Sequence, residues 1–210
     1  MSDEKKPTEF DSFSKLPPSL TTTSLQVMKF AGTYLKFETD PDTKQDTRWF
    51  DWSSFTASIN NYTGDDLTFD KYKNTVIASK ESTVSTMVEK IVKFLLDALS
   101  LVLDETYIKA LTSTIEATFT NLKEKSSNGF LDFKKSKNGQ NSSWEYRVQF
   151  AFPNPDLSDF FYSLVTTIKL EANVSDESEW WGLVGSSSKN FSATIDAMQL
   201  VVRKGFKKPN

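Results

Sequence analysis

The sequence predicts an α+β fold, in which helices flank a central antiparallel β-sheet within a single domain. In the first half of the chain, apolar residues recur at steps of three or four, which is the period of an amphipathic helix. After Asn128-Gly129, apolar and polar residues alternate, which is the period of a strand with two different faces. Helices that precede a run of antiparallel strands form an α+β layout, with the helices packed on the sheet.

The two ends of the chain are expected to be tails. Residues 1–23 are mostly polar and contain three prolines, so little structure is expected before Leu20. Residues 204–210 are basic. The domain is therefore expected to span residues 24–203, between a flexible N-terminal tail (1–23) and a basic C-terminal tail (204–210).

Two amphipathic helices are expected in the first third of the chain. Residues 24–37 show helical spacing, with Ser24 as a suitable N-cap. Residues 47–60 repeat apolar side chains at the same steps. Residues 67–78 fit no single pattern, although Thr75-Val76-Ile77 suggest a short strand.

A helical hairpin is expected in the middle of the chain. Residues 82–103 form its first and most apolar helix, whose last turns are apolar on nearly every side. Such a helix is expected to be sandwiched between other elements. Asp104 is a suitable N-cap for a second helix, to about residue 124, and the short connection makes the pair antiparallel.

The strands follow in the second half. After a short strand at residues 130–134, the clearest strand covers residues 144–152, and its apolar face consists of Trp144, Tyr146, Val148, Phe150 and Phe152. A second long strand covers residues 160–172, and its apolar face includes Phe160, Tyr162, Leu164, Ile168 and Leu170. Trp180 and Trp181 begin a short apolar piece, and a last strand covers residues 191–203.

The composition excludes several classes of function. The net charge of −3 argues against a dedicated nucleic-acid-binding protein, which usually has a basic face. The chain has no cysteine and no histidine, which removes disulfides, Cys and His metal sites and Ser-His-Asp catalysis. Neither a phosphate-binding loop nor EF-hand spacing is present. We therefore expect no enzymatic activity, no metal and no cofactor.

The two long strands support two interpretations. A strand of about 9–11 residues can cross a bilayer, and both strands are long enough, with one face for lipid and one for water. The same alternation is typical of any sheet with one face under a layer of helices, which is the more ordinary interpretation. The tryptophans are similarly ambiguous, because amphipathic rings favour membrane interfaces but also fill cores. Of Trp180 and Trp181, one is expected to be exposed, because neighbours in a strand point to opposite faces.

Four blocks of the sequence resemble the Cyt family of cytolytic δ-endotoxins and the related fungal cytolysins such as volvatoxin. They are TIEATFTNL (114–122), SWEYRVQFAFPNP (143–155), the long strand at 160–174, and NFSATIDAMQLVV (190–202). Their spacing is similar to that of the family over about half of the chain. The N-terminal helices match only in order and length.

The resemblance implies a pore-forming or membrane-disrupting toxin, with a central sheet wrapped by two layers of helical hairpins. It implies that the protein binds membrane phospholipids directly and self-associates into oligomers on membranes, after its helices swing away from the sheet. It also implies activation by proteolytic removal of terminal segments, here the two expected tails. Residues 1–10 contain no signal-peptide core, so we expect synthesis in soluble form, followed by secretion or release to act at a target-cell membrane.

The expected membrane-contacting residues are the ten apolar strand residues named above together with Trp180 and Trp181. Four residues of the 82–103 helix are expected to shield the apolar strand faces in water: Ile91, Leu95, Leu99 and Val102. Uncovering those faces in water costs about 25 cal/mol per Å², a cost that contact with lipid removes.

Three rival functions remain open. A non-lytic lipid- or glycan-binding protein of virulence or defence would use exposed aromatic residues such as Trp180 or Trp181. An enzyme with an acidic site would depend on a divalent metal or show turnover. A structural or storage protein would leave liposomes intact.

Overall fold

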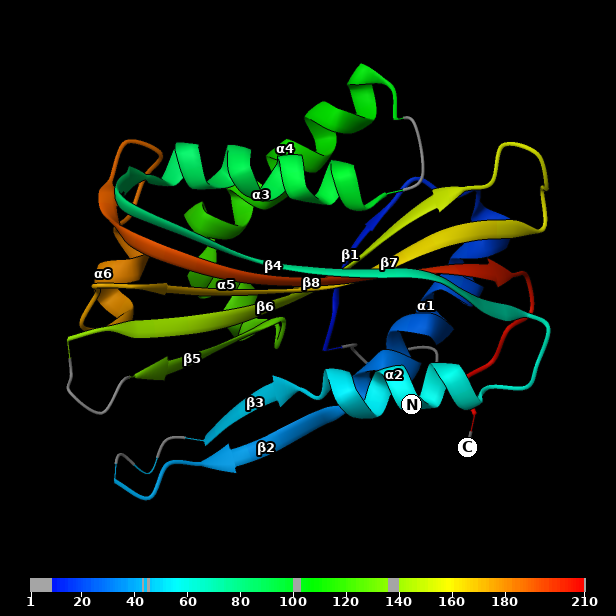
Figure 1. Cartoon of the computed structure of the whole chain (residues 1–210), viewed down its shortest axis with the longest axis horizontal. Helices are drawn as coiled ribbons and strands as arrows, with labels where there is room; N and C mark the ends of the chain where they lie inside the picture. The colour runs from blue at the N-terminus through cyan, green and yellow to red at the C-terminus, as the bar shows by residue number, and fades with distance from the viewer. Residues whose placement is uncertain (1–8, 43, 45, 100–102, 136–139, 210) are drawn as a thin grey trace. The chain divides into compact units, whose positions relative to one another are not determined.

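The computed structural model describes residues 9–42, 44, 46–99, 103–135 and 140–209, which form an α+β fold (Figure 1). Its strands are β1 (Asp11–Ser14), β2 (Leu35–Thr39), β3 (Asp46–Phe50), β4 (Leu67–Thr83), β5 (Leu131–Lys135), β6 (Ser142–Pro153), β7 (Phe160–Ala172) and β8 (Ser188–Arg203). Its helices are α1 (Pro18–Gly32), α2 (Trp52–Asn61), α3 (Val84–Ala98), α4 (Glu105–Thr120), α5 (Leu122–Ser127) and α6 (Glu177–Trp181). The predicted α+β class is confirmed.

The main sheet is mixed, whereas the sequence predicted an antiparallel one. Its strand order is β1-β6-β7-β8-β4, and β5 also pairs with β6. Strand β1 runs parallel to β6, opposite residues 148–151, while β5 runs antiparallel to β6, opposite residues 142–146. The two short strands therefore cover successive parts of one edge of β6, which reduces its unpaired backbone groups. Strands β2 and β3 form a separate antiparallel ribbon.

The described residues group into two compact units. Unit 1 draws on Met1–Tyr72, Arg147–Thr167 and Met198–Asn210, and unit 2 draws on Lys73–Tyr146 and Ile168–Ala197. The division falls within β4, β6, β7 and β8, so each of these strands contributes residues to both units. Helices α1 and α2 belong to unit 1, and α3 to α6 belong to unit 2.

In unit 1, helices α1 and α2 pack on the sheet through one apolar cluster. The cluster joins Val27, Phe30, Phe55, Ile59, Phe161, Val165, Leu200 and Val202, among others. The ring centroids of Phe30 and Phe55 lie 5.8 Å apart, so the two helices share this core. Each fully buried large apolar side chain stabilises the fold by about 1.5–3 kcal/mol, which makes this cluster a main source of stability in unit 1.

The structure corrects the expectation of a flexible tail over residues 1–23, because part of this segment forms regular structure. Strand β1 pairs with β6, and Phe10 and Phe13 are only 1% and 9% exposed. Helix α1 starts at Pro18, a position where the missing N–H of proline leaves no hydrogen bond unmade. The prolines that suggested a tail therefore mark a helix start instead.

The C-terminal segment expected as a tail over residues 204–210 also makes specific contacts. Phe206 is 1% exposed and belongs to the apolar cluster of unit 1. The Lys208 backbone N–H donates to Gln26 Oε1 over 3.1 Å. These contacts tie the segment to α1.

The two N-terminal helices expected from sequence are shifted. Residues 24–37 divide into α1, which ends at Gly32, and strand β2, so Ser24 lies inside the helix instead of capping it. Residues 47–60 divide into β3 and α2, because Asp51 caps α2 by accepting from the Ser54 backbone N–H at 3.1 Å. The aromatic spacing in this region looked helical, but it spans a strand and the following helix.

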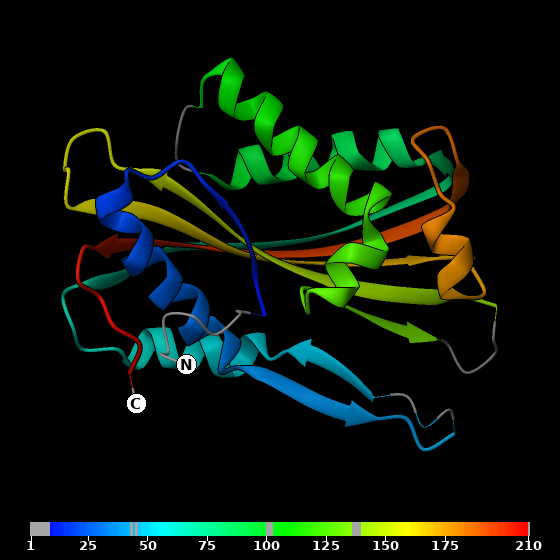
Figure 2. The same ribbon diagram turned by 180° about the vertical axis from the view of Figure 1, so that it is seen from behind.

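The predicted hairpin of α3 and α4 is present in unit 2, where both views show the two helices side by side (Figures 1 and 2). Asp104 caps α4 as predicted, accepting from the Tyr107 backbone N–H at 2.9 Å. Helix α3 begins later than expected, at Val84, with Thr83 as its cap. Gly129, with a φ of 82°, follows α5 and marks the change of period seen in the sequence.

Two further segments differ from the sequence-based expectation. The ambiguous residues 67–78 belong to the 17-residue strand β4. Trp180 and Trp181 lie in the short helix α6, which Asp176 caps, and not in a strand.

Within the residues that the structure describes, no helix is long and apolar enough to cross a membrane.

Candidate functional site

The apolar face of β6 that the sequence proposed for membrane contact is buried. Its residues are at most 1% exposed: Trp144, Tyr146, Val148, Phe150 and Phe152. On β7, Leu164, Ile168 and Leu170 are buried, while Phe160 and Tyr162 are partly exposed. The contact of these residues with lipid stays a proposal.

In unit 2, helix α4 covers the apolar face of β6 at Trp144. The rings of Phe119 and Trp144 meet edge to face with centroids 5.6 Å apart, and Trp180 packs on Trp144 at 5.9 Å. The buried Nε1 of Trp144 has no acceptor among the described residues.

The residues expected to shield the strands lie on or next to α3. Ile91 and Leu95 are 0% exposed, and Leu99, just after the helix, is 6% exposed. Val102 lies outside the described residues. The burial of the first three fits the expected shield, which stays a proposal.

The opposite face of β6 and β7 is also buried in unit 1, which their alternation did not predict. Gln149 donates to Ser24 Oγ at 2.5 Å and accepts from Ser163 Oγ at 3.0 Å. Arg147 Nε donates to the Glu9 carbonyl at 3.2 Å. Buried polar groups require such partners, and the partners here lie on α1, on β7 and just before β1. The strands are therefore covered on both faces.

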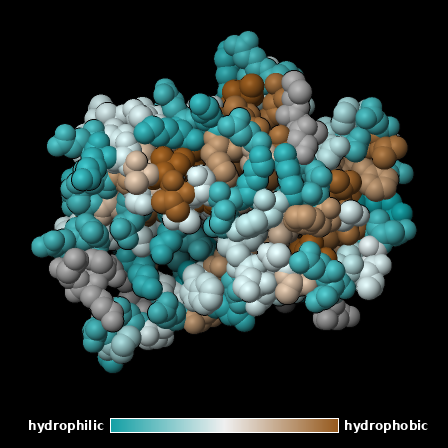
Figure 3. Space-filling model, viewed as in Figure 1, coloured by the Kyte–Doolittle hydropathy of each residue, from teal (hydrophilic) through white to brown (hydrophobic). Residues whose placement is uncertain are grey.

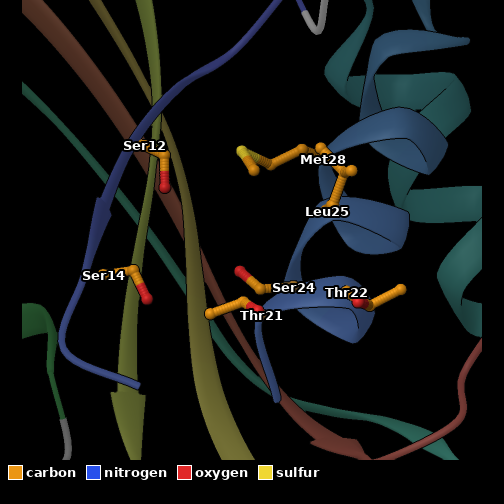
Figure 4. Close-up of a pocket in the computed structure, with 7 residues that line it drawn as sticks. All are labelled: Ser12, Ser14, Thr21, Thr22, Ser24, Leu25 and Met28. Carbon is orange, nitrogen blue, oxygen red and sulfur yellow. The ribbon is translucent and has the colours of Figure 1, made fainter. Parts of the chain in front are cut away.

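A pocket of about 360 Å³ lies between β1 and α1 in unit 1 (Figure 4). Its lining consists of Ser12, Ser14, Thr21, Thr22, Ser24, Leu25 and Met28. In Figure 4 Ser12 and Ser14 extend from the strand toward the helix that carries Ser24 and Met28. The described lining holds no charged side chain, and Ser24 is engaged by Gln149. The pocket is best explained as a gap in packing between a short strand and a helix.

Helix α6 holds its two tryptophans in different environments. Trp180 is 0% exposed and donates from Nε1 to Ser142 Oγ at 2.7 Å, whereas Trp181 is 39% exposed. The Lys123 ammonium lies 5.4 Å from the centroid of the Trp181 ring. One tryptophan of the pair is exposed, as expected. The two side chains differ in environment because they are neighbours in a helix, and not because they alternate along a strand.

Sequence reasoning missed exposed apolar residues outside β6 and β7. Phe37 on the β2–β3 ribbon is 78% exposed, and Val76 on β4 is 64% exposed. On the face drawn in Figure 3, apolar residues form separate patches among hydrophilic ones. The apolar spacing of residues 24–37 had placed Phe37 in a helix, so its exposure had no signal in the sequence.

The shifted pKa values belong to groups with structural partners. The hydrogen bond from Lys189 lowers the pKa of Glu179, and the Lys189 Nζ lies 2.7 Å from Glu179 Oε1. Burial and a hydrogen bond to Asp66 raise the pKa of Tyr62 to about 12. Among the described residues, no group of three or more acidic side chains is placed to hold a metal ion.

Solved toxin structures share this fold. A δ-endotoxin structure matches with a TM-score of 0.77 and 18% sequence identity, over 100% of this chain and 89% of that chain. A crystal structure of the activated Cyt2Ba monomer from Bacillus thuringiensis subsp. israelensis matches with a TM-score of 0.75 and 17% identity, over 93% of this chain and 98% of that chain. At these identities the likeness defines the class of fold, which is that of the Cyt-type toxins.

The model of the Bacillus thuringiensis toxin family matches residues 25–204. The chain therefore belongs to the Bacillus thuringiensis toxin family, and the resemblance noted from the sequence is confirmed. The comparison with curated protein sequences finds no match.

Proposed function

We propose that this protein is a cytolysin that binds lipid bilayers directly, rearranges, and self-associates into oligomers that permeabilise the membrane. One observation carries the proposal: a member of a toxin family buries the long apolar faces of β6 and β7. No catalytic step is needed, because exchanging helix contacts for lipid contacts removes the cost of uncovering these faces.

The free energy of uncovering the strands decides when such a change can occur. Each large apolar side chain on β6 that loses its cover in water costs about 1.5–3 kcal/mol. Contact with lipid removes this cost, because the acyl chains are as apolar as the helix side chains they replace. The protein is therefore expected to keep its helices packed in water and to release them only at a bilayer.

Liposome dye release tests the proposal. Release should rise with protein concentration on vesicles of neutral or anionic phospholipid, and native gels of the membrane fraction should show oligomers. Prior protease trimming should increase release if removal of terminal segments activates the toxin. Membrane flotation without dye release would contradict permeabilisation and favour the non-lytic lipid- or glycan-binding protein.

A matched pair of variants tests whether the covering of β6 controls the release. Phe119→Leu weakens the α4 contact with Trp144, and Phe55→Leu weakens the core of unit 1. Both residues are nearly inaccessible, at 2% and 0% exposed, and each change is expected to cost about 1–2 kcal/mol. Phe119→Leu should speed dye release more than Phe55→Leu at equal loss of stability. Equal acceleration would indicate general instability instead.

A further inference from the structure

The exposed tryptophan of α6 lines a second pocket, which belongs wholly to unit 2. The pocket has a volume of about 500 Å³. Its lining consists of Thr120, Asn121, Leu122, Lys123, Glu124, Ser127 and Trp181. Apart from the Trp181 ring and the buried Leu122, every lining side chain is polar and exposed. One aromatic surface is thus surrounded by hydrogen-bonding groups.

The backbone that carries Trp181 is held in place by its neighbour in the chain. Trp180 is anchored by its hydrogen bond to Ser142 and by its contact with Trp144. Asp176 caps the start of α6, accepting from the Glu179 backbone N–H at 2.9 Å. A backbone fixed in this way loses little conformational freedom when a ligand binds, which lowers the cost of binding.

The polar groups of the pocket include both donors and acceptors. The hydroxyl of Ser127 donates to the Lys123 carbonyl at 2.9 Å, and the Thr120 hydroxyl donates to backbone carbonyls of α4 at 3.3–3.4 Å. Their oxygens therefore face a ligand as acceptors. Glu124 adds carboxylate acceptors, Lys123 adds an ammonium donor, and the Asn121 amide can do both.

We propose that this pocket binds a neutral pyranose sugar, with the sugar ring stacked on Trp181. A pyranose has one face of partly positive C–H groups, which suits the negative face of the indole ring. Its hydroxyls both donate and accept, which matches the mixed lining. The Lys123 ammonium that now lies over the ring must move aside, at a cost of about 0.5–1 kcal/mol for an exposed cation–π contact.

A phosphocholine head group fits the same pocket less well. It has no hydrogen-bond donor, so the acceptor oxygens of Thr120 and Ser127 would stay unmatched. Its quaternary ammonium would also compete with the Lys123 ammonium for the ring face. The inference is independent of the proposed membrane permeabilisation, because a sugar site selects a surface and does not open a pore.

The test is a titration of ¹⁵N-labelled full-length protein with methyl pyranosides of glucose, galactose, mannose and N-acetylglucosamine. The indole N–H signal of Trp181, assigned with Trp181→Phe, should shift with a Kd on the order of 1 mM for at least one sugar. Trp181→Ala should weaken that binding by about tenfold, and Trp181→Phe by less, as measured from the backbone amide signals of the pocket residues in both variants. Trp49→Ala is the matched control, because Trp49 is 41% exposed on the β2–β3 ribbon and should leave binding unchanged.

A second experiment, with vesicles, tests whether the sugar is carried by a lipid or by another molecule. Phosphatidylcholine vesicles with and without the glycolipid that carries the best sugar are compared by flotation. Tighter flotation with glycolipid, lost in Trp181→Ala, indicates a lipid-borne sugar, whereas binding to the free sugar alone indicates a glycan on another carrier. The proposal is overturned if no pyranoside shifts the Trp181 signal, if the backbone amide signals of the pocket report the same Kd in Trp181→Ala as in the unaltered protein, or if phosphocholine alone shifts the Trp181 signal. Dye release from plain phosphatidylcholine vesicles reports separately on the proposed function.

Discussion

At the scale of single residues, the polar side chains of β6 have a role that their alternation did not reveal. Gln149 is 0% exposed and is hydrogen-bonded to serines on α1 and β7. These bonds join α1 to the sheet where an apolar contact would otherwise be expected. A polar contact of this kind depends on every partner, because each one left unpaired is desolvated without compensation.

Replacing Gln149 should show this dependence. Gln149→Met keeps the volume but leaves the Ser24 and Ser163 hydroxyls without that partner, so it should lower the free energy of unfolding by about 2 kcal/mol. Adding Ser24→Ala and Ser163→Ala should restore most of the loss, because all three positions are then apolar. Urea unfolding of the single and triple variants measures both steps. A triple variant less stable than the single one would show that the loss of these hydrogen bonds is not the main reason for the lower free energy of unfolding.

At the scale of elements, α6 and the segments beside it are tied by an ion pair. Glu179 accepts from Lys189 at 2.7 Å and from the Ser175 backbone N–H at 3.2 Å. Both members of the pair are partly exposed, with side chains 38% and 26% exposed. Solvent screening therefore limits the contribution of this pair to less than about 1 kcal/mol.

The pH dependence of α6 follows from the lowered pKa of Glu179. A carboxyl with a lowered pKa in the folded state contributes its stability above its ordinary pKa and loses it as the pH falls through the lowered one. Glu179→Gln should therefore reduce the free energy of unfolding at pH 7, by less than about 1 kcal/mol, and the reduction should be smaller at pH 3. Urea unfolding at both pH values tests this, with Glu177→Gln on the same helix as control. A difference that persists unchanged in acid would contradict the prediction.

At the scale of the whole molecule, the two edges of the main sheet are formed by different kinds of strand. One edge of β6 is covered along residues 142–151 by β5 and then by β1, apart from Arg147. The strand at the other end of the sheet order is the long β4. An uncovered strand edge is a template for pairing with another chain, so we expect the short strands beside β6 to limit self-association through this edge.

Deleting residues 1–16 should uncover part of this edge. The deletion removes β1 together with Phe10 and Phe13, so it should cost about 3–6 kcal/mol of stability. It should also promote self-association in solution, measured by size-exclusion chromatography with light scattering. Deletion of residues 1–8 leaves β1 in place and serves as control. If the longer deletion stays monomeric and equally stable, β1 does not protect the edge.

Part of the candidate site could be predicted and part could not. The apolar faces of β6 and β7 were identified because the alternation of apolar and polar residues along a strand is visible in consecutive residues of the sequence. The pocket beside Trp181 was missed, because Lys123 and Trp181 lie far apart in the chain and meet only through α5 and α6. The expected helix at residues 24–37 was wrong after Gly32, because pairing of β2 with β3 outweighed a weak helical pattern.

The sequence by itself determined the α+β class, the α3–α4 hairpin, the cap at Asp104 and the positions of β6, β7 and β8. These features depend on periodicity and on caps within a few residues, which the chain encodes locally. Only the tertiary structure decided that β1 pairs in parallel with β6, that both faces of β6 are covered, and that Trp181 is exposed beside Lys123. Such features depend on partners distant in the chain, as when Arg147 reaches Glu9 across 138 positions, and local pattern carries no information about them.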